Sequence, residues 1–146
     1  MVTETTSDEF STRLRSVGLK VTAPRLAVLS ALSTPGHFEV DEVYRRVSTT
    51  LPGTSLQTIY GVLSALSDTG LARRIEPAGS PALYESRTGD NHHHVVCSGC
   101  GRIEDVDCVV DESPCLTPSS AGGFAVHTAE VTFWGLCPAC QAAAAH

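Results

Sequence analysis

The sequence predicts an α+β protein with two domains, an N-terminal winged helix-turn-helix domain at residues 1–86 and a small α/β domain at residues 87–146. Amphipathic segments with helical spacing fill the first half of the chain, and a short hairpin pattern follows them. After SRTGDN the composition changes to β-branched residues mixed with histidine, cysteine and acidic residues. The 42% hydrophobic content of the 146 residues allows packed cores, which the 5% aromatic content keeps small.

The first two helices are predicted from apolar spacing and from residues that begin or end helices. Phe10, Leu14 and Val17 recur at steps of four and three, and a glycine directly follows them. The second helix occupies TAPRLAVLSAL, in which Thr22 is the expected N-cap and Pro24 suits the first turn. A Pro-Gly pair ends this helix.

The third and fourth helices follow the same logic. The third begins near Asp41 and stops at the Pro-Gly of LPGTS. The fourth occupies SLQTIYGVLSALSDTG, where Ser55 can cap the start and Gly70 can end the helix. Its apolar stripe, at steps of three, four and three, consists of Leu56, Ile59, Leu63 and Leu66.

A hairpin completes the order of elements in a winged helix-turn-helix. LARRIEPAGSPALYES has two short β-like runs around PAGSP. The alternative is an ordinary α+β domain without a DNA role, because the helix-turn-helix outline has few obligatory residues. In a winged helix, the basic residues near the second helix and on the hairpin would contact phosphates, whereas the alternative is a solvated basic face. These residues are Lys20, Arg25, Arg73 and Arg74.

The formal charge of −6 lies mainly in the second half of the chain. Residues 1–85 hold eight Lys/Arg and nine Asp/Glu, whereas residues 86–146 hold two and seven. The acidic half favours cations, and the composition is not that of a strongly basic nucleic-acid-binding protein. Because no apolar run approaches the roughly 18 residues of a membrane span and the start lacks a secretory signal, we expect a cytoplasmic protein.

The second domain is predicted to be rich in strands and tight turns. HHHVVC and RIEDVDC read as strands joined by SGCG, and GFAVHTAEVTFWGLC is a further β-rich run. DESPCLTPSSAGG, with its prolines and glycines, should be mostly irregular. CPAC and a short alanine-rich tail follow.

Four cysteines form two C-x-x-C motifs with 36 residues between them. Two residues between thiolates let both sulfurs of a turn face one ion, so the pairs Cys97/Cys100 and Cys137/Cys140 can bind one tetrahedral Zn²⁺. The alternative is a pair of thioredoxin-like redox motifs, which would make the protein a thiol oxidoreductase. That motif expects a helix, whereas both pairs are predicted in turns beside β-rich runs, so structural zinc is favoured. Cys108 and Cys115 lie outside both motifs and are either small buried residues or redox-sensing thiols.

Strand alternation separates the histidines of NHHHVVC from the cysteines. In a strand, His92 and His94 project from one face, while His93 and Cys97 project from the other. An imidazole pair needs further ligands, and carboxylates are abundant nearby. A site of imidazole nitrogen and carboxylate oxygen suits Fe²⁺, Mn²⁺ or a second Zn²⁺. The alternative is a polar loop.

Four segments resemble the ferric uptake regulator (Fur) family of metal-dependent transcriptional repressors. They are TAPRLAVLSAL, TIYGVLSALSDTGLARRIE, HHHVVCSGCGRIEDV and FWGLCPAC, in the family's order, and the resemblance covers residues 14 to 140. Within the family, GDNHHHVVC, DVDC, ESPCL and WGLCPAC are most similar to the actinobacterial FurA/CatR branch. That branch is associated with peroxide response and catalase control.

The resemblance implies a winged-helix DNA-binding domain, a C-terminal dimerisation domain, and a homodimer that binds a palindromic double-stranded DNA operator. It assigns the four C-x-x-C thiols to structural zinc. It also implies a regulatory site for Fe²⁺, Mn²⁺ or another divalent ion, and this site would favour DNA binding. The implied regulatory ligands are His37, Glu85, His92, His94 and Asp105.

The chain departs from the family pattern in three places. Gly61 stands where the family often has arginine after the tyrosine, which leaves Ser55, Gln57, Thr58 and Tyr60 as the candidates for DNA contact from the fourth helix. DESPCLTPSSAGG replaces a segment that is often helical, so we expect less helix in the second domain. The family's auxiliary metal site lacks its usual histidine in register. It would map to His93, Glu112 and Glu130.

The resemblance therefore implies a metal-dependent, redox-sensitive repressor of catalase or other oxidative-stress genes that releases its operator on exposure to peroxide. The oxidised group is then a histidine of the regulatory site, a zinc thiolate, Cys108 or Cys115. The alternatives are an iron-, zinc- or nickel-uptake regulator of the same family, since similar ligands suit several ions.

Overall fold

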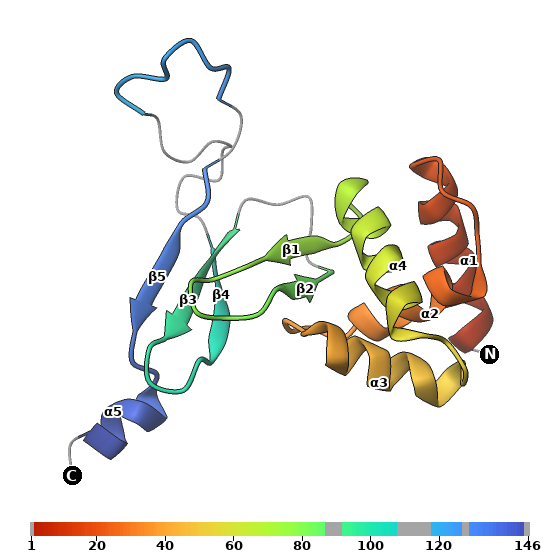
Figure 1. The fold of residues 1–146 in the computed structure, drawn as a ribbon, viewed down its shortest axis with the longest axis horizontal. Helices are drawn as coiled ribbons and strands as arrows, with labels where there is room; N and C mark the ends of the chain where they lie inside the picture. The colour runs from red at the N-terminus through yellow and green to blue at the C-terminus, as the bar shows by residue number, and fades with distance from the viewer. Residues whose placement is uncertain (1, 87–91, 108–117, 127–128, 145–146) are drawn as a thin grey trace. The chain divides into compact units, whose positions relative to one another are not determined.

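The computed structural model describes residues 2–86, 92–107, 118–126 and 129–144, and it has the α+β fold that the sequence predicts (Figure 1). The chain divides into two compact units, Met1–Thr88 and Gly89–His146. The first unit contains four helices and a hairpin. The second contains a three-stranded sheet and a short helix.

The helices of the first unit are α1 (Val2–Ser16), α2 (Ala23–Leu32), α3 (Val40–Thr50) and α4 (Leu56–Asp68). The predicted caps are present at two of them. Thr22 accepts a hydrogen bond from the amide of Arg25 at 3.3 Å, and Ser55 accepts one from the amide of Thr58 at 3.1 Å. Each hydroxyl satisfies an amide that the first helical turn leaves without a partner. After α4, Gly70 has φ +79°, a left-handed conformation that ends a helix without strain at glycine.

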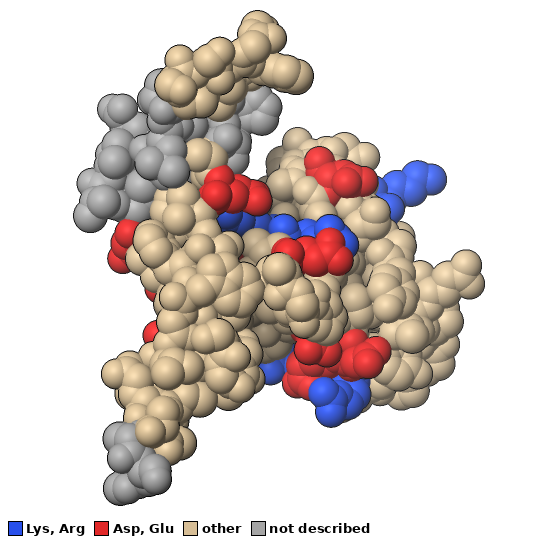
Figure 2. Space-filling view, turned by 60° about the vertical axis from the view of Figure 1, so that its left-hand side comes forward, with Lys and Arg blue, Asp and Glu red and all other residues tan. Residues whose placement is uncertain are grey.

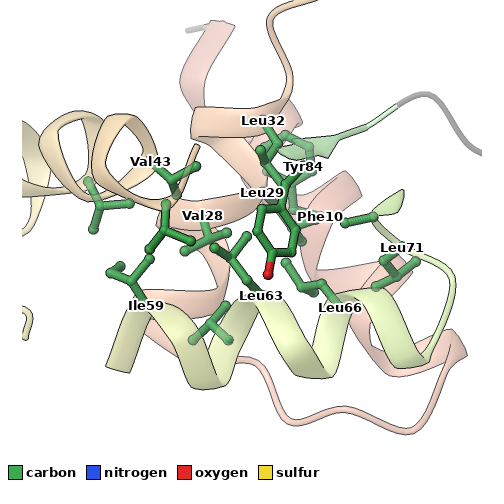
Figure 3. Close-up of a cluster of buried hydrophobic side chains, with 14 of the residues drawn as sticks. Phe10, Val28, Leu29, Leu32, Val43, Ile59, Leu63, Leu66, Leu71 and Tyr84 are labelled. Atoms are coloured by element: carbon green, nitrogen blue, oxygen red, sulfur yellow. The ribbon is translucent and has the colours of Figure 1, made fainter. Parts of the chain in front are cut away.

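An apolar cluster holds the first unit together (Figure 3). Leu14, Ile59 and Leu63 are fully buried, and Tyr84 joins the cluster from the hairpin. Burial of a side chain of this size contributes about 1.5–3 kcal/mol relative to exposure. The apolar residues that recur at helical spacing in the sequence are therefore the ones whose burial stabilises this unit. The labelled members are Phe10, Val28, Leu29, Leu32, Val43, Ile59, Leu63, Leu66, Leu71 and Tyr84.

Leu56 departs from the apolar stripe that the sequence predicts for α4. Ile59, Leu63 and Leu66 are buried, whereas Leu56 is 38% exposed. A helical side chain covers the surface N-terminal to its own Cα, so the side chain of the first residue extends beyond the start of the helix. Spacing alone identifies the side of the helix but not this end effect.

The predicted hairpin consists of β1 (Arg73–Ile75) and β2 (Leu83–Glu85), paired antiparallel with Arg73 opposite Glu85. An isolated antiparallel bridge joins Phe38, in the segment before α3, to Tyr84 of β2. Its two backbone hydrogen bonds measure 2.9 and 2.8 Å. This bridge holds the segment around His37 beside β2, the second strand of the hairpin that forms the wing of the winged helix.

The second unit is a sheet of β3 (His92–Cys97), β4 (Ile103–Asp107) and β5 (Thr132–Gly135) in the order β4-β3-β5 (Figure 1). β4 is antiparallel to β3, and β5 is parallel to it. Within the described part of GFAVHTAEVTFWGLC, strand is confined to β5. The described residues of DESPCLTPSSAGG, which are 118–123, contain neither helix nor strand, as the sequence predicts.

One local prediction is wrong. The sequence places both C-x-x-C motifs in turns, but the second runs into α5 (Pro138–Ala144). Proline suits the first helical position because it has no amide hydrogen to satisfy, and alanine is the strongest helix former. Of the described residues, none belongs to a helix with the length and hydropathy needed to span a bilayer.

Candidate metal centres

The four cysteines of the two C-x-x-C motifs converge in the second unit. The sulfurs of Cys97, Cys100, Cys137 and Cys140 all lie within 4.8 Å of one another, and the Sγ atoms of Cys100 and Cys137 are 3.8 Å apart. A tetrahedral ion with Zn–S bonds of about 2.3 Å gives sulfur–sulfur edges of about 3.8 Å. The donor set and its spacing fit one structural Zn²⁺. Two separate redox disulfides would not require the two motifs to meet.

The local backbone explains the convergence. The β3–β4 turn closes with a bond from the amide of Gly101 to the carbonyl of Cys97 at 2.9 Å, and the amide of Ser98 donates to the carbonyl of Gly135 at 2.8 Å. The turn after β3 is thereby fixed beside the end of β5. A Cβ at Gly99 would lie 3.0 Å from the sulfur of Cys140, so any larger residue there would push the two motifs apart by a few tenths of an ångström.

The cluster shifts the proton affinity of two thiols in opposite directions. The amide of Cys137 donates to the sulfur of Cys97 at 3.3 Å, and with the amides of Cys100 and Gly99 it lowers the pKa of Cys97 to about 6. Hydrogen bonding with the neighbouring sulfurs, that of Cys137 first, raises the pKa of Cys140 to about 12. A fourth negative sulfur is unfavourable among the other three without a cation, and a divalent ion removes that penalty.

A second set of donors gathers on β3 and β4. His92 Nε2 lies 3.5 Å from Asp105 Oδ1, and His94 Nε2 lies 3.3 Å from the same oxygen. The two imidazoles meet edge to face with centroids 4.9 Å apart. Because His94 pairs directly with Asp105 across the strands, all three side chains share one face of the sheet. Two nitrogens and one oxygen form half of an N/O metal site.

The first unit contains a third pair of potential ligands. His37 Nε2 lies 2.8 Å from Glu85 Oε2, and the two side chains are 6% and 2% exposed. The bridge between Phe38 and Tyr84 fixes this contact, since each ligand is the sequence neighbour of a bridging residue. A buried carboxylate needs a compensating charge or hydrogen bonds, which imidazole, a cation or a metal ion can supply.

No group of three potential ligands that includes His93 or Glu130 is found among the described residues. His93 Nδ1 accepts a hydrogen bond from the amide of Val131 at 3.3 Å, which links β3 to the segment before β5. Glu130 is exposed. Three further candidates, Glu112, Cys108 and Cys115, lie outside the described residues.

The residues expected to contact DNA lie on the surface of the first unit. Gln57 and Tyr60 are exposed on α4, with Tyr60 at 53%, and the hydroxyls of Ser55 and Thr58 are 2.9 Å apart at its start. Lys20 is exposed, and its carbonyl accepts from Arg25 Nη1 at 2.8 Å. Basic and acidic atoms are interspersed on the face drawn in Figure 2. This suits a few placed phosphate contacts rather than a broad basic surface.

Two features escaped sequence reasoning. Leu56 adds an apolar side chain to the exposed side of α4, and such side chains contact thymine methyl groups in major-groove recognition. Arg73, expected only at phosphates, has its Nε 3.9 Å from Glu85 Oε1. The opposite charges of two strands in one hairpin could have suggested this ion pair, but the strand register was needed to establish it.

A winged-helix unit followed by a sheet unit that gathers thiolate and imidazole donors defines a class of protein, the metal-dependent transcriptional regulators. Comparison with known proteins agrees. Residues 16–133 match the model of the ferric uptake regulator family. The transcriptional regulator FurA of Mycobacterium tuberculosis is 51% identical over 133 residues, which cover 91% of this chain and 90% of that protein.

Solved structures share the fold. The ferric uptake regulator of Vibrio cholerae superposes with a TM-score of 0.64 at 26% identity, covering 87% of this chain and 98% of that chain. The Campylobacter jejuni peroxide stress regulator has a TM-score of 0.54 at 31% identity, covering 68% and 70%. The chain belongs to the ferric uptake regulator family. It is therefore a transcriptional regulator and not an enzyme, and the thiol oxidoreductase alternative is wrong.

Proposed function

We propose that this chain is a homodimeric repressor that binds a palindromic operator of catalase or other oxidative-stress genes when a divalent ion occupies its regulatory site, and that peroxide relieves the repression. The observation that carries the proposal is the convergence of His92 and His94 on Asp105, on the sheet face from which His93 and the thiolate Cys97 point away. Zinc held by thiolates and a second ion held by nitrogen and oxygen are chemically distinct sites.

Each unit offers an incomplete set of regulatory ligands. His37 and Glu85 supply one nitrogen and one carboxylate from the winged-helix unit, and the sheet unit supplies two imidazoles and a carboxylate. An ion that takes ligands from both sets ties the DNA-binding unit to the dimerisation unit. Such an ion stabilises whichever arrangement completes its coordination, so it raises operator affinity if that arrangement fits two half-sites.

The winged helix supports DNA binding through α4. Gln57, Thr58 and Tyr60 on the exposed side of its first turns are uncharged and can hydrogen-bond, which suits base edges in a major groove. Lys20 and Arg74 lie on the surface and can reach phosphates. Gly61 stands where the family resemblance implies an arginine. Because α4 contains neither lysine nor arginine, contacts from basic side chains to phosphate must come from outside it.

The sheet unit supports dimerisation. β5 lies at one end of the order β4-β3-β5, and its Phe133 and Trp134 are 49% and 51% exposed. Large exposed apolar side chains on a terminal strand are unfavourable in water and favour a partner surface. A second copy of this unit is the partner that a palindromic operator requires.

Peroxide sensitivity is proposed from the ligand chemistry and from the similarity to a peroxide stress regulator of C. jejuni. His92 and His94 would be among the residues that hold Fe²⁺, and the ion would supply the chemistry that activates peroxide beside them. An imidazole carbon would gain one oxygen atom of peroxide, and the other oxygen would leave as water. A modified ligand binds the ion poorly, and operator affinity falls. Oxidation of a zinc thiolate, Cys108 or Cys115 is the competing trigger.

The test uses the zinc-loaded protein and a DNA duplex that the Mn²⁺-loaded protein selects from a random pool. His92→Ala should abolish Mn²⁺-dependent binding to this duplex while zinc content stays near the wild-type value. The variant His127→Ala is the matched control and should keep both properties. Unchanged Mn²⁺-dependent affinity in His92→Ala would refute the regulatory assignment.

An iron-uptake regulator is the second candidate, because two relatives at 53% and 47% identity are named ferric uptake regulation proteins of Mycolicibacterium fortuitum. The two functions differ in their response to peroxide. A peroxide sensor loaded with Fe²⁺ loses operator affinity and gains the mass of one oxygen on a histidine, whereas the Mn²⁺-loaded form resists. An iron-uptake regulator keeps its operator in both forms until the metal is removed.

A further inference from the structure

Arg73 is the side chain that links the wing to the ligand pair of the first unit. It pairs directly with Glu85 across β1 and β2, and its Nε lies 3.9 Å from Glu85 Oε1. The other carboxylate oxygen, Oε2, is 2.8 Å from His37 Nε2. One buried carboxylate thus has an arginine on one oxygen and an imidazole on the other.

The three side chains differ in their exposure to solvent. Glu85 is 2% exposed and His37 is 6% exposed, whereas Arg73 is 22% exposed. A distance of 3.9 Å is within the range of an ion pair but too long for a hydrogen bond. The guanidinium therefore offsets the buried negative charge at ion-pair distance, and an arginine side chain has enough rotatable bonds to exchange one partner for another.

We propose that Arg73 is a positioning residue that serves as the resident counter-cation of Glu85, competes with the regulatory ion, and is released toward DNA phosphate when the ion binds. This inference rests on the proposed metal role of His37 and Glu85. A divalent ion on Glu85 repels a guanidinium that lies about 4 Å from the same carboxylate. Because the site is largely buried, water screens this repulsion only weakly. Arg73 leaves Glu85 when the ion arrives.

The same displacement links metal to DNA within one unit. Arg73 belongs to the wing, and an arginine released from a carboxylate becomes available to a phosphate. The coupling is reciprocal: if metal binding raises the affinity for DNA by a given factor, DNA binding raises the affinity for metal by the same factor. This link between metal and DNA needs no change in the fold of the winged helix, because only Arg73 changes its partner.

The first experiment measures Mn²⁺ affinity of the zinc-loaded protein without DNA, from the electron paramagnetic resonance signal of free Mn²⁺. Arg73→Gln removes the competing charge, so we expect Mn²⁺ to bind more tightly by on the order of tenfold. Arg45→Gln, which removes the same charge from an exposed position paired with Glu42, should leave Mn²⁺ affinity unchanged. Equal or weaker Mn²⁺ affinity in Arg73→Gln would overturn the competition.

The second experiment measures the salt dependence of binding to the DNA duplex that the Mn²⁺-loaded protein selects. At saturating Mn²⁺, Arg73→Gln should lower the slope of log affinity against log salt concentration by about one, because one phosphate contact is lost. An unchanged slope beside tighter Mn²⁺ binding would overturn the release to phosphate. Arg73→Lys should restore the slope, since ammonium also binds phosphate.

Failure of this inference is distinguishable from failure of the proposed site. Glu85→Gln removes the carboxylate on which both depend. If Mn²⁺ affinity is the same in Glu85→Gln and the wild type, Glu85 is not a ligand and the site assignment fails. If Glu85→Gln weakens Mn²⁺ binding while Arg73→Gln changes nothing, the site stands and only the role of Arg73 is rejected.

Discussion

The two units of this chain are stabilised by different chemistry. The winged-helix unit contains the whole apolar core cluster, with side chains such as Leu14 and Leu63 at 0% exposure. The described part of the sheet unit buries Val96 and Cys97 together with three histidines, and leaves Phe133 and Trp134 about half exposed. Its strands are short, and its convergent feature is a cluster of four sulfurs.

We therefore expect folding to be independent of metal binding in the winged-helix unit and linked to it in the sheet unit. An apolar core stabilises the winged helix whatever metal is present. The described part of the sheet unit buries little apolar surface, so we expect this unit to need a metal or a partner, because the entropy lost on ordering its chain is otherwise not offset. Regulation by metal can then act on the arrangement of the units while the DNA-reading surface stays folded.

The largest expected effect is the loss of zinc from the sheet unit. Cys100→Ser removes one of four thiolates, and zinc contributes about 10–16 kcal/mol in small zinc-dependent domains. We expect near-zero zinc content, a red-shifted emission of Trp134, the chain's single tryptophan, and loss of the dimer by light scattering. Helical circular dichroism should persist, since α1 to α4 lie in the other unit.

Cys108→Ser is the matched control for that change, because it replaces a cysteine outside the two C-x-x-C motifs. It should retain zinc and the dimer. A zinc-free Cys100→Ser protein that remained dimeric with native tryptophan emission would show that the sheet unit does not depend on the metal, and the contrast between the units would fail.

The next effect concerns the winged-helix unit alone. Leu63→Ala creates a cavity at a fully buried position of α4, which should lower the free energy of unfolding of this unit by about 2–5 kcal/mol. Helical circular dichroism followed in urea measures the change. Zinc content and the emission of Trp134 before unfolding should match the wild type. Loss of zinc in this variant would contradict the independence of the two units.

Much of this could be predicted from the sequence because the signals are local. Thr22 and Ser55 cap helices as expected, since an N-cap depends only on the next three residues. Strand alternation places His92 and His94 on one face, because the side-chain period of a strand is two. The spacing within each C-x-x-C motif also indicates a zinc ligand pair without tertiary information.

What escaped prediction depends on contacts between distant segments. The pairing of Arg73 with Glu85 requires the hairpin register, and the seven residues between β1 and β2 do not fix one. The contact between His37 and Glu85 depends on a bridge between Phe38 and Tyr84, 46 residues apart in the chain, so only the family resemblance, and not the local sequence, indicated His37. α5 was missed because C-P-A-C reads as a turn, although its proline and alanines also favour a helix start.

The smallest expected effect concerns protons within the zinc cluster. While the sheet unit stays folded, the pKa of Cys97 is lowered from 9.0 to about 6, so its thiolate contributes stability that is complete above about 9 and is lost as the pH falls through about 6. The pKa of Cys140 is raised from 9.0 to about 12, so this thiol keeps its proton at neutral pH. Zinc requires both groups as thiolates.

Between about pH 6.5 and 8.5, zinc uptake should therefore displace the proton of Cys140 but hardly any from Cys97. Log zinc affinity, measured by competition with a chelator, should rise with pH less steeply in Cys140→Ser than in the wild type, by about one unit per pH unit. Cys97→Ser loses a ligand as well, but it should keep the wild-type slope in this window. Equal slopes in the two variants would show that the zinc-free protein does not keep the hydrogen bond from the Cys137 amide that lowers the proton affinity of Cys97. The four sulfurs would then act as one equivalent set rather than as a site already polarised by its backbone.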